Sequence, residues 1–412
     1  MEGFNSMADK LKDIVIKEAE MDTNLDTLRF RTKTEFIERD NGSLPNNWII
    51  GIDIGYSSVK VESHNIIASF PSYAKKVTDD FSFAMDVPDD AIFYKDHKTN
   101  EMWLIGRTAQ NLIERGDTSD SLTALYGRER YNNPMFKAYS AVGLAVGMRT
   151  NKYGSPDGKK ITIQTGLPEC YMNIDDMLLI DSLAGSYDFE IRIGKAPWEK
   201  FNFTIDAADI NIISQPKGSL FSVCFDNNGN GVADAESIME NSLIFDPGFG
   251  TLDIFPILGG TVKHGETFDD LGMRRVFEET SKRILSEYKQ NIPVPAMQKY
   301  LETGFISCYD RRNPFKSEDL PFNHFLNECN VKICEEALER MVDVIPVYEY
   351  KHFIITGGTG DAWNACIRNK LKGFKSLQII DGNRNDKTLS SVYSNVRGYF
   401  LFRKMLTAKA NS

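Results

Sequence analysis

The stretch Asp246-Pro247-Gly248-Phe249-Gly250-Thr251-Leu252-Asp253 follows the apolar run Ser242–Phe245. A shorter relative of it, Asp53-Ile54-Gly55-Tyr56-Ser57, follows the apolar run Trp48–Ile52. Each pattern predicts a β-strand that ends at an Asp, a tight turn built on Gly, and a second strand. Glycine lets backbone N–H groups approach phosphate oxygens, and the Asp offers the hard oxygen that Mg²⁺ prefers. Two such loops predict a phosphate-binding cleft between two halves of the chain.

A third element lies later in the chain. Phe353–Thr356 has the apolar character of a buried strand, and Gly357 and Gly358 follow it before a helical stretch, Asp361–Leu371. Two glycines leave a flat backbone surface on which a purine and its ribose can lie. Lys60 stands seven residues after Asp53 on the outgoing strand, where its ammonium is expected to reach the β and γ phosphates.

In this order the three elements resemble the nucleotide site of the actin-like ATPase superfamily. Four further segments resemble its ParM-like plasmid-segregation branch: Trp103–Gly106, Thr165–Pro168, Gln215–Gly218 and Asn395–Tyr399. The resemblance covers roughly residues 48–406. It implies an α/β, actin-like ATPase fold in which two similar α/β domains flank a nucleotide cleft. The expected division is an N-terminal extension (1–46), domain I (47–240 plus 390–412) and domain II (241–389).

The resemblance also implies a set of ligands and the residues that hold them. The expected cofactors are Mg²⁺ and ATP or ADP, with GTP as the alternative, and Asp53 and Asp246 would hold the metal through its waters. Amides of both Gly turns would grip the phosphates. The residues expected to bind nucleotide are Asp53, Gly55, Tyr56, Ser57, Lys60, Gly248, Phe249, Gly250, Thr251, Arg274, Glu278, Gly357, Gly358 and Thr359. For Arg274 and Glu278, an exposed ion pair one helical turn apart explains the spacing equally well.

Three carboxylates are the candidates for catalysis. In ParM-like proteins a Glu shortly after a Leu-Pro pair orients the attacking water, and here Glu169 follows Pro168 directly. This is earlier than the usual offset, so a plain Glu at the start of a helix is the competing interpretation. Asp253 is the other candidate near the γ phosphate, and Asp246 acts through the metal.

The composition limits the partners. The net charge of −10 argues against direct binding to DNA or to an anionic membrane, either of which needs a basic surface. The six cysteines form no C-x-x-C motif, which favours reduced thiols. No segment approaches the roughly 20 apolar residues of a spanning helix, so we expect a cytoplasmic protein.

The remaining predictions concern secondary structure. Residues Phe189–Ile193, Phe201–Ile205 and Asp209–Ser214 suggest an antiparallel meander, and Asp226–Gly231 a solvated turn rather than a calcium loop. Helices are predicted at Met7–Met21, Ser121–Arg130, Met135–Arg149, Asp269–Lys289, within Glu318–Val344, and at Ser390–Leu406.

The sequence thus predicts a nucleotide-dependent filament that segregates plasmid DNA through a DNA-binding adaptor of the ParR type. Alternatives are a non-segregating or phage cytoskeletal filament and a small-molecule kinase of the same fold. The apolar stripe Leu11, Ile14, Val15 and Ala19 predicts that residues 1–46 contact a neighbouring subunit.

Overall fold

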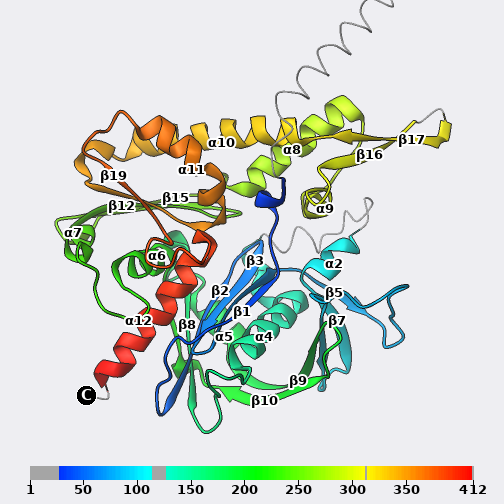
Figure 1. The fold of residues 1–412 in the computed structure, drawn as a ribbon, viewed down its shortest axis with the longest axis horizontal. Helices are drawn as coiled ribbons and strands as arrows, with labels where there is room; N and C mark the ends of the chain where they lie inside the picture. The colour runs from blue at the N-terminus through cyan, green and yellow to red at the C-terminus, as the bar shows by residue number, and fades with distance from the viewer. Residues whose placement is uncertain (1–26, 114–126, 311–312, 411–412) are drawn as a thin grey trace, which may run out of the picture.

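The computed structural model describes residues 27–113, 127–310 and 313–410. Its two halves lie one above the other, each built on a β-sheet flanked by helices (Figure 1). The helix predicted at Met7–Met21, and most of the one predicted at Ser121–Arg130, fall outside the described residues. Within the described residues, Arg128–Asn132 form a short 3-10 helix instead.

The sheet of the lower half has the strand order β1-β4-β3-β2-β8-β11. Strands β2, β8 and β11 run parallel, whereas β1, β4, β3 and β2 pair antiparallel. The bounds are β1 Glu35–Glu38, β2 Asn47–Ile54, β3 Ser58–Ser63, β4 Ile66–Pro71, β8 Lys160–Leu167 and β11 Ile210–Ser214. Residues 35–38, which the sequence assigned to an N-terminal extension, therefore form the edge strand of this sheet.

The sheet of the upper half repeats this topology. Its order is β14-β13-β12-β18-β19, with β15 also on β13; β12 and β13 form an antiparallel hairpin, and β12, β18 and β19 run parallel. The bounds are β12 Asn241–Pro247, β13 Leu252–Leu258, β14 Thr261–Val262, β15 Glu266–Phe268, β18 His352–Ile355 and β19 Gln378–Asp381. In both sheets a hairpin is followed by two parallel strands, so the predicted fold of two similar α/β halves is confirmed.

Helices bury the faces of both sheets. The apolar helix α4 (Pro134–Met148) covers β2 and β3, and its predicted burial is confirmed. Helix α12 (Ser394–Ala410) packs on β2, β3 and β8 and crosses α6 (Gln215–Cys224). At this crossing a Cβ on Gly398 would lie 1.7 Å from the carbonyl oxygen of Gly218. The glycines in two of the segments that carried the ParM-like resemblance are thus required by helix packing.

The other elements surround these layers. A five-stranded antiparallel sheet has the order β10-β9-β6-β7-β5, and a separate hairpin, β16–β17, projects from the upper half (Figure 1). The strand bounds are β5 Ala74–Val77, β6 Ile92–Asp96, β7 Glu101–Ile105, β9 Gly185–Ile193, β10 Glu199–Ile205, β16 Phe305–Asp310 and β17 Asn313–Pro321. The helix bounds are α2 Arg107–Asn111, α5 Asp176–Leu183, α7 Ala235–Glu240, α8 Met273–Tyr288, α9 Val294–Tyr300, α10 Asn323–Val344 and α11 Gly357–Leu371.

Four of the secondary-structure predictions are wrong in part. Residues 210–214 form no meander with β10, because β11 pairs parallel with β8 in the lower sheet. Helix α8 begins at Met273 rather than Asp269, so its first turn carries no acidic residue. The helix predicted at Ser390–Leu406 begins only at Ser394, after the 3-10 helix Ser391–Tyr393, whereas the helix predicted within Glu318–Val344 is confirmed as α10. Helix α11 begins at Gly357 and not at Asp361, so the two glycines form its first turn.

Asp226 is the centre of the solvated turn predicted at 226–231. Its Oδ1 accepts hydrogen bonds from the backbone N–H groups of Asn228 (2.9 Å) and Asn230 (2.8 Å). The predicted turn is confirmed. Among the described residues, no helix combines the length and apolar character needed to cross a membrane.

Candidate functional site

A cavity of about 340 Å³ lies where the turns of the two repeated hairpins meet helix α11. This volume is within the range of small-molecule sites. Fourteen of the predicted site residues line it: Asp53, Gly55, Tyr56, Ser57, Lys60, Asp246, Gly248, Phe249, Gly250, Thr251, Asp253, Gly357, Gly358 and Thr359. Segments about 190 residues apart in sequence therefore contribute to one site.

The first hairpin, β2–β3, carries a balanced pair of charges. Asp53 and Lys60 are opposite each other in the ladder, and Lys60 Nζ lies 2.9 Å from Asp53 Oδ2. Gln215 donates to the other oxygen of Asp53 over 3.3 Å. The turn is closed by the Gly55 N–H, which donates to the carbonyl of Ser58 over 3.0 Å. The Gly55 amide therefore bonds within the turn in this structure, and its contact with a phosphate stays a prediction.

The second hairpin, β12–β13, repeats the geometry but places two acids opposite each other, Asp246 and Asp253. Its turn is closed in the same way, by the Gly248 N–H donating to the carbonyl of Thr251 over 2.7 Å. The Gly248 amide, like that of Gly55, thus bonds within its own turn, and its contact with a phosphate stays a prediction. Asn395 donates to Asp246 over 2.9 Å, and the Thr267 hydroxyl donates to Asp253 over 2.5 Å.

Burial dominates the electrostatics of this acidic pair. Desolvation raises the pKa of Asp246 to about 6, although the hydrogen bond from Asn395 opposes the shift. Desolvation likewise raises the pKa of Asp253 to about 7, and the neighbouring charges of Asp246 and Glu169 add to it. The raised pKa values mean that the surroundings of these two buried carboxylates do not fully compensate their negative charge. A divalent cation fits that deficit, because carboxylate oxygen is the donor that Mg²⁺ prefers.

Glu169 lies beside this acidic pair. It starts a short 3-10 helix, Glu169–Tyr171, after β8, and its backbone N–H hydrogen-bonds the carboxyl of Asp253. Its Oε2 atom is buried without a hydrogen-bond partner among the described residues. The neighbours Pro168 and Tyr171 line the cavity. An unsatisfied buried carboxylate oxygen at this position suits a group that accepts a hydrogen bond from a ligand or water.

Helix α11 joins the second hairpin through its first turn. Gly357 has φ 75°, and a Cβ there would lie 3.0 Å from the carbonyl oxygen of Pro247 and 3.1 Å from Asp246 Oδ1. The Thr359 hydroxyl donates to the carbonyl of Gly248 over 2.8 Å. The glycine is therefore needed both for the backbone conformation and for the close approach to Asp246.

Arg274 and Glu278 lie on α8, next to Met273, which lines the cavity. Arg274 Nε is 3.5 Å from Glu278 Oε1, and both side chains are partly exposed. The two residues thus form the ion pair that was the alternative interpretation of their spacing. A contact of either residue with nucleotide remains a prediction.

Arg130 is a residue of the cavity that the sequence analysis did not identify. Arg130 is buried, with a relative exposure of 7%, and its guanidinium lies 4.4 Å from the centre of the Tyr56 ring. One Nη donates to the carbonyl of Ile54, whereas Nε and the other Nη are buried without a hydrogen-bond partner among the described residues. An anion would satisfy these buried nitrogens, because guanidinium N–H groups form strong hydrogen bonds with anionic oxygens. A lone Arg before a helix gives no sequence signal for this placement.

Gln215 and Asn395 were also not assigned, although both belong to segments quoted for the ParM-like resemblance. Each hydrogen-bonds one of the two Asp residues that end the repeated strands, Gln215 to Asp53 and Asn395 to Asp246. Their place in those segments was the signal that could have identified them.

The comparisons with known proteins agree with this geometry. Residues 51–218 match a family model described as the N-terminal domain of actin-like proteins. No curated protein matches the chain.

Similar solved structures include a non-polymerisable quadruple mutant of pCBH ParM, with 20% identity and a TM-score of 0.65 over 87% of this chain and 100% of that one. A 15-stranded ParM filament from Clostridium botulinum has 19% identity and a TM-score of 0.65, covering 88% and 100%. Apo psk41 ParM has 18% identity and a TM-score of 0.58, covering 89% and 100%. Residues 51–218 thus resemble the N-terminal domain of actin-like proteins, and the chain has the actin-like fold that these ParM structures share.

Proposed function

We propose that the chain binds ATP with Mg²⁺ in this cavity, hydrolyses it, and assembles into a filament whose stability depends on the bound nucleotide. The observation that carries the proposal is the convergence of both Asp-Gly hairpins and the first turn of α11 on one cavity. A polyphosphate chain between the hairpins would contact both halves of the molecule at once. Its hydrolysis would therefore alter how the halves sit relative to each other.

Asp53 and Asp246 are the proposed holders of Mg²⁺, which when bound would neutralise charge on the phosphates. The raised pKa of Asp246 supports this assignment, since its carboxylate has no cation of its own in the hairpin. GTP is the alternative nucleotide.

Lys60 and Arg130 are the proposed cations for the phosphates. Lys60 is held by Asp53 at the edge of the cavity, and Arg130 presents two unsatisfied guanidinium nitrogens there. Guanidinium and ammonium groups fixed in a buried site stabilise the charge that develops in phosphoryl transfer. The protein has little covalent chemistry to perform in this reaction, so positioning of such charges supplies most of the acceleration.

Glu169 and Asp253 are the proposed acceptors for the attacking water. The two carboxyls are adjacent, and Glu169 retains a buried oxygen without a partner among the described residues. We assign the water to Glu169 and a supporting charge to Asp253, because Thr267 already occupies one oxygen of Asp253.

The projecting hairpin β16–β17 supports self-association. Phe315 is 98% exposed, and Phe305 and Tyr309 on the same hairpin are about half exposed. Large apolar side chains this exposed mark contact surfaces. We assign the hairpin to the contact between successive subunits, where one surface meets a different surface of the next copy and the stack does not close.

Segregation of plasmid DNA through a separate DNA-binding adaptor is the biological role that we propose for the filament. The net charge of −10 favours indirect attachment to DNA, since direct binding requires a basic surface. A non-segregating filament would bind and hydrolyse nucleotide in the same way. A small basic protein that binds both the filament and DNA would therefore distinguish a segregating filament from a non-segregating one.

Sedimentation of the purified chain at micromolar concentration tests the proposal. We expect the chain to pellet with Mg²⁺ and ATP, and to return to the supernatant once the ATP is consumed. Phe315→Ser is the matched variant that should still bind nucleotide without pelleting. A chain that remains monomeric with ATP, GTP, ADP and without nucleotide would leave a small-molecule kinase as the better account.

A further inference from the structure

Residues 27–39 form a continuous segment that passes between the two halves of the molecule, and we call it the N-terminal strap. In Figure 1 the dark-blue start of the described chain lies between the lower and the upper half. The strap comprises a 3-10 helix, Thr27–Phe30, and strand β1 with the residues beside it. It precedes residue 51, where the match to actin-like proteins begins.

The start of the strap is attached to the upper half. The Thr27 hydroxyl donates to the carbonyl of Leu301 over 2.8 Å, and the Thr32 N–H donates to Gln298 Oε1 over 3.0 Å. Arg31 forms an ion pair of 3.0 Å with Glu302. These partners lie on helix α9 or directly after it. The attachment is completed by Phe30, which is 5% exposed and packs in the main hydrophobic core.

The end of the strap is attached to the lower sheet. Strand β1 pairs antiparallel with β4, with Glu35 opposite Ser69. The Ser69 hydroxyl donates to the carbonyl of Lys33 over 3.1 Å, and the Tyr393 hydroxyl donates to Glu35 over 2.9 Å. Ser69 is itself opposite Lys60 in the next ladder, so the strap runs beside the first phosphate hairpin.

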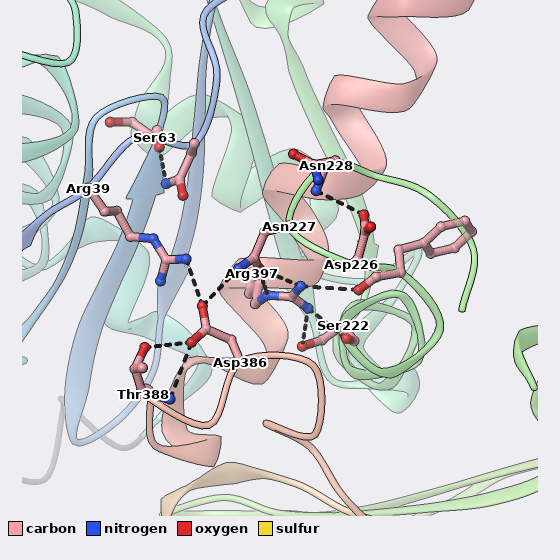
Figure 2. A network of polar contacts seen from close by, with 11 residues as sticks. Arg39, Ser63, Ser222, Asp226, Asn227, Asn228, Asp386, Thr388 and Arg397 are labelled. Atoms are coloured by element: carbon pink, nitrogen blue, oxygen red, sulfur yellow. Dashed lines mark hydrogen bonds and ion pairs between the residues drawn. The ribbon is translucent and has the colours of Figure 1, made fainter. Parts of the chain in front are cut away.

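Arg39 secures the last residue of the strap. Its guanidinium lies 2.6 Å from Asp386, which also accepts from Asn227 and Thr388 (Figure 2). In the same network Arg397 of α12 donates to Ser222 and Asn227 (Figure 2). The strap is therefore fixed at both ends by contacts to residues far away in sequence.

The middle of the strap forms a wall of the cavity. Arg29, Phe30, Arg31, Thr32, Lys33 and Glu35 all line it. Arg29 and Lys33 are exposed residues, and the 3-10 helix that carries Arg29 lies against α11, whose first turn also lines the cavity. Two cationic side chains thus line the same cavity as the turns of both hairpins.

We propose that the strap is part of the nucleotide-binding site, with Arg29 and Lys33 binding the polyphosphate chain and the strap holding the two halves around it. This inference rests on the proposed function. Cationic side chains on a segment tied to both halves slow the release of an anionic ligand, because the ligand leaves only after these charge-assisted contacts break. Residues before the matched family domain thereby set how long a nucleotide stays bound.

The test is the dissociation rate of a fluorescent ATP analogue, chased from the full chain with excess ATP in the presence of Mg²⁺. We expect Arg29→Ala with Lys33→Ala to speed release by about tenfold or more. Both side chains are exposed, so their removal leaves the core intact, and far-UV circular dichroism with a thermal midpoint checks the fold. Lys76→Ala with Arg275→Ala removes one Lys and one Arg charge from an exposed position on β5 and a partly exposed position on α8, and this variant should release at the wild-type rate.

Glu302→Gln is a second variant that leaves the lining residues unchanged but weakens the ion pair with Arg31. We expect it to speed release about twofold, as a partly exposed pair contributes little. A double variant that releases at the wild-type rate while wild type binds tightly would overturn the inference and leave the proposed function standing. A wild-type chain that never binds the analogue would overturn both.

Discussion

The two repeated hairpins share a backbone and differ in charge. In each, a strand ends in Asp, and a Gly N–H closes the turn onto a carbonyl three residues later. Opposite the Asp, however, β3 presents Lys60, whereas β13 presents Asp253. The first hairpin is neutralised internally, and we propose that the second is neutralised by a cation from outside. One backbone motif therefore serves two roles, with the cross-strand partner deciding which.

Asp246→Asn is the substitution that we expect to have the largest effect. It removes the proposed metal-holding charge while keeping the shape and the hydrogen bond from Asn395. Hydrolysis should fall by about a hundredfold or more, because a fixed charge is lost from the transition state. Phosphate release from ATP is the measurement, with Asp226→Asn in the exposed turn as the control. Wild-type turnover in Asp246→Asn would contradict the site.

Glu169→Ala tests the water position next to the acidic hairpin. Hydrolysis should slow by about a hundredfold, as expected for loss of a general base, while nucleotide binding and assembly persist. Filaments of this variant should remain pelletable long after wild-type filaments have dissolved. Ordinary disassembly would transfer the role to Asp253.

Lys60→Met removes the cation opposite Asp53, so that the first hairpin, like the second, has an Asp with no cation opposite it. Asp53 is buried, so it loses its ion pair with Lys60, and the cavity loses a phosphate cation. We expect ATP affinity to fall about tenfold, together with a lower thermal midpoint, because a buried carboxylate is left unpaired. Equilibrium binding measures the affinity for ATP. Unchanged affinity would show that Lys60 serves only Asp53.

Arg130→Met removes the buried guanidinium without emptying its space. ATP affinity should fall about tenfold in this variant, because a charge-assisted contact is lost. Stability without ligand should change little or increase, since two of its nitrogens lack partners. A large loss of stability with unchanged affinity would assign Arg130 to the fold alone.

The pH dependence of stability without ligand is a separate test of the acidic hairpin. The pKa of Asp246 is about 6 in the folded chain and about 4 when unfolded, so the folded state binds the proton more tightly. Without ligand, the stability associated with this proton is fully present below about pH 4 and is lost as pH rises through about 6. Asp246→Asn should therefore be more stable than wild type at pH 8, by up to about 3 kcal/mol, but not at pH 4. Denaturant unfolding at both pH values checks the difference.

Much of this comparison could be predicted from sequence. The pattern of an apolar run, Asp and Gly is local, and it identified both hairpins and the residues of their turns that line the cavity. The occupied amides of Gly55 and Gly248 could not be predicted, because the same glycine suits a turn bond and a phosphate contact. Arg130 and the strap residues Arg29 and Lys33 carry no local pattern, since tertiary packing alone brings them to the cavity.

The mispredicted elements have different causes. Residues 210–214 alternate like an antiparallel strand, but β11 is placed by its parallel neighbour β8. The acidic Asp269 suggested a helix start, yet Gly272 with φ 146° precedes the first turn of α8 and fixes its beginning. A contact distant in sequence thus places β11, whereas the backbone conformation of the preceding residue sets the start of α8.

Proton release on binding Mg²⁺ and ATP tests the central claim most directly, that the second hairpin requires an external cation. Isothermal titration near pH 6.5, in buffers of different ionisation enthalpy, measures the number of protons released. Because the pKa values of Asp246 and Asp253 are about 6 and about 7, we expect about one proton to leave as the cation enters. Asp246→Asn should release less, and ATP without Mg²⁺ should bind more weakly. Equal binding of ATP with and without Mg²⁺, with no proton released, would contradict the account.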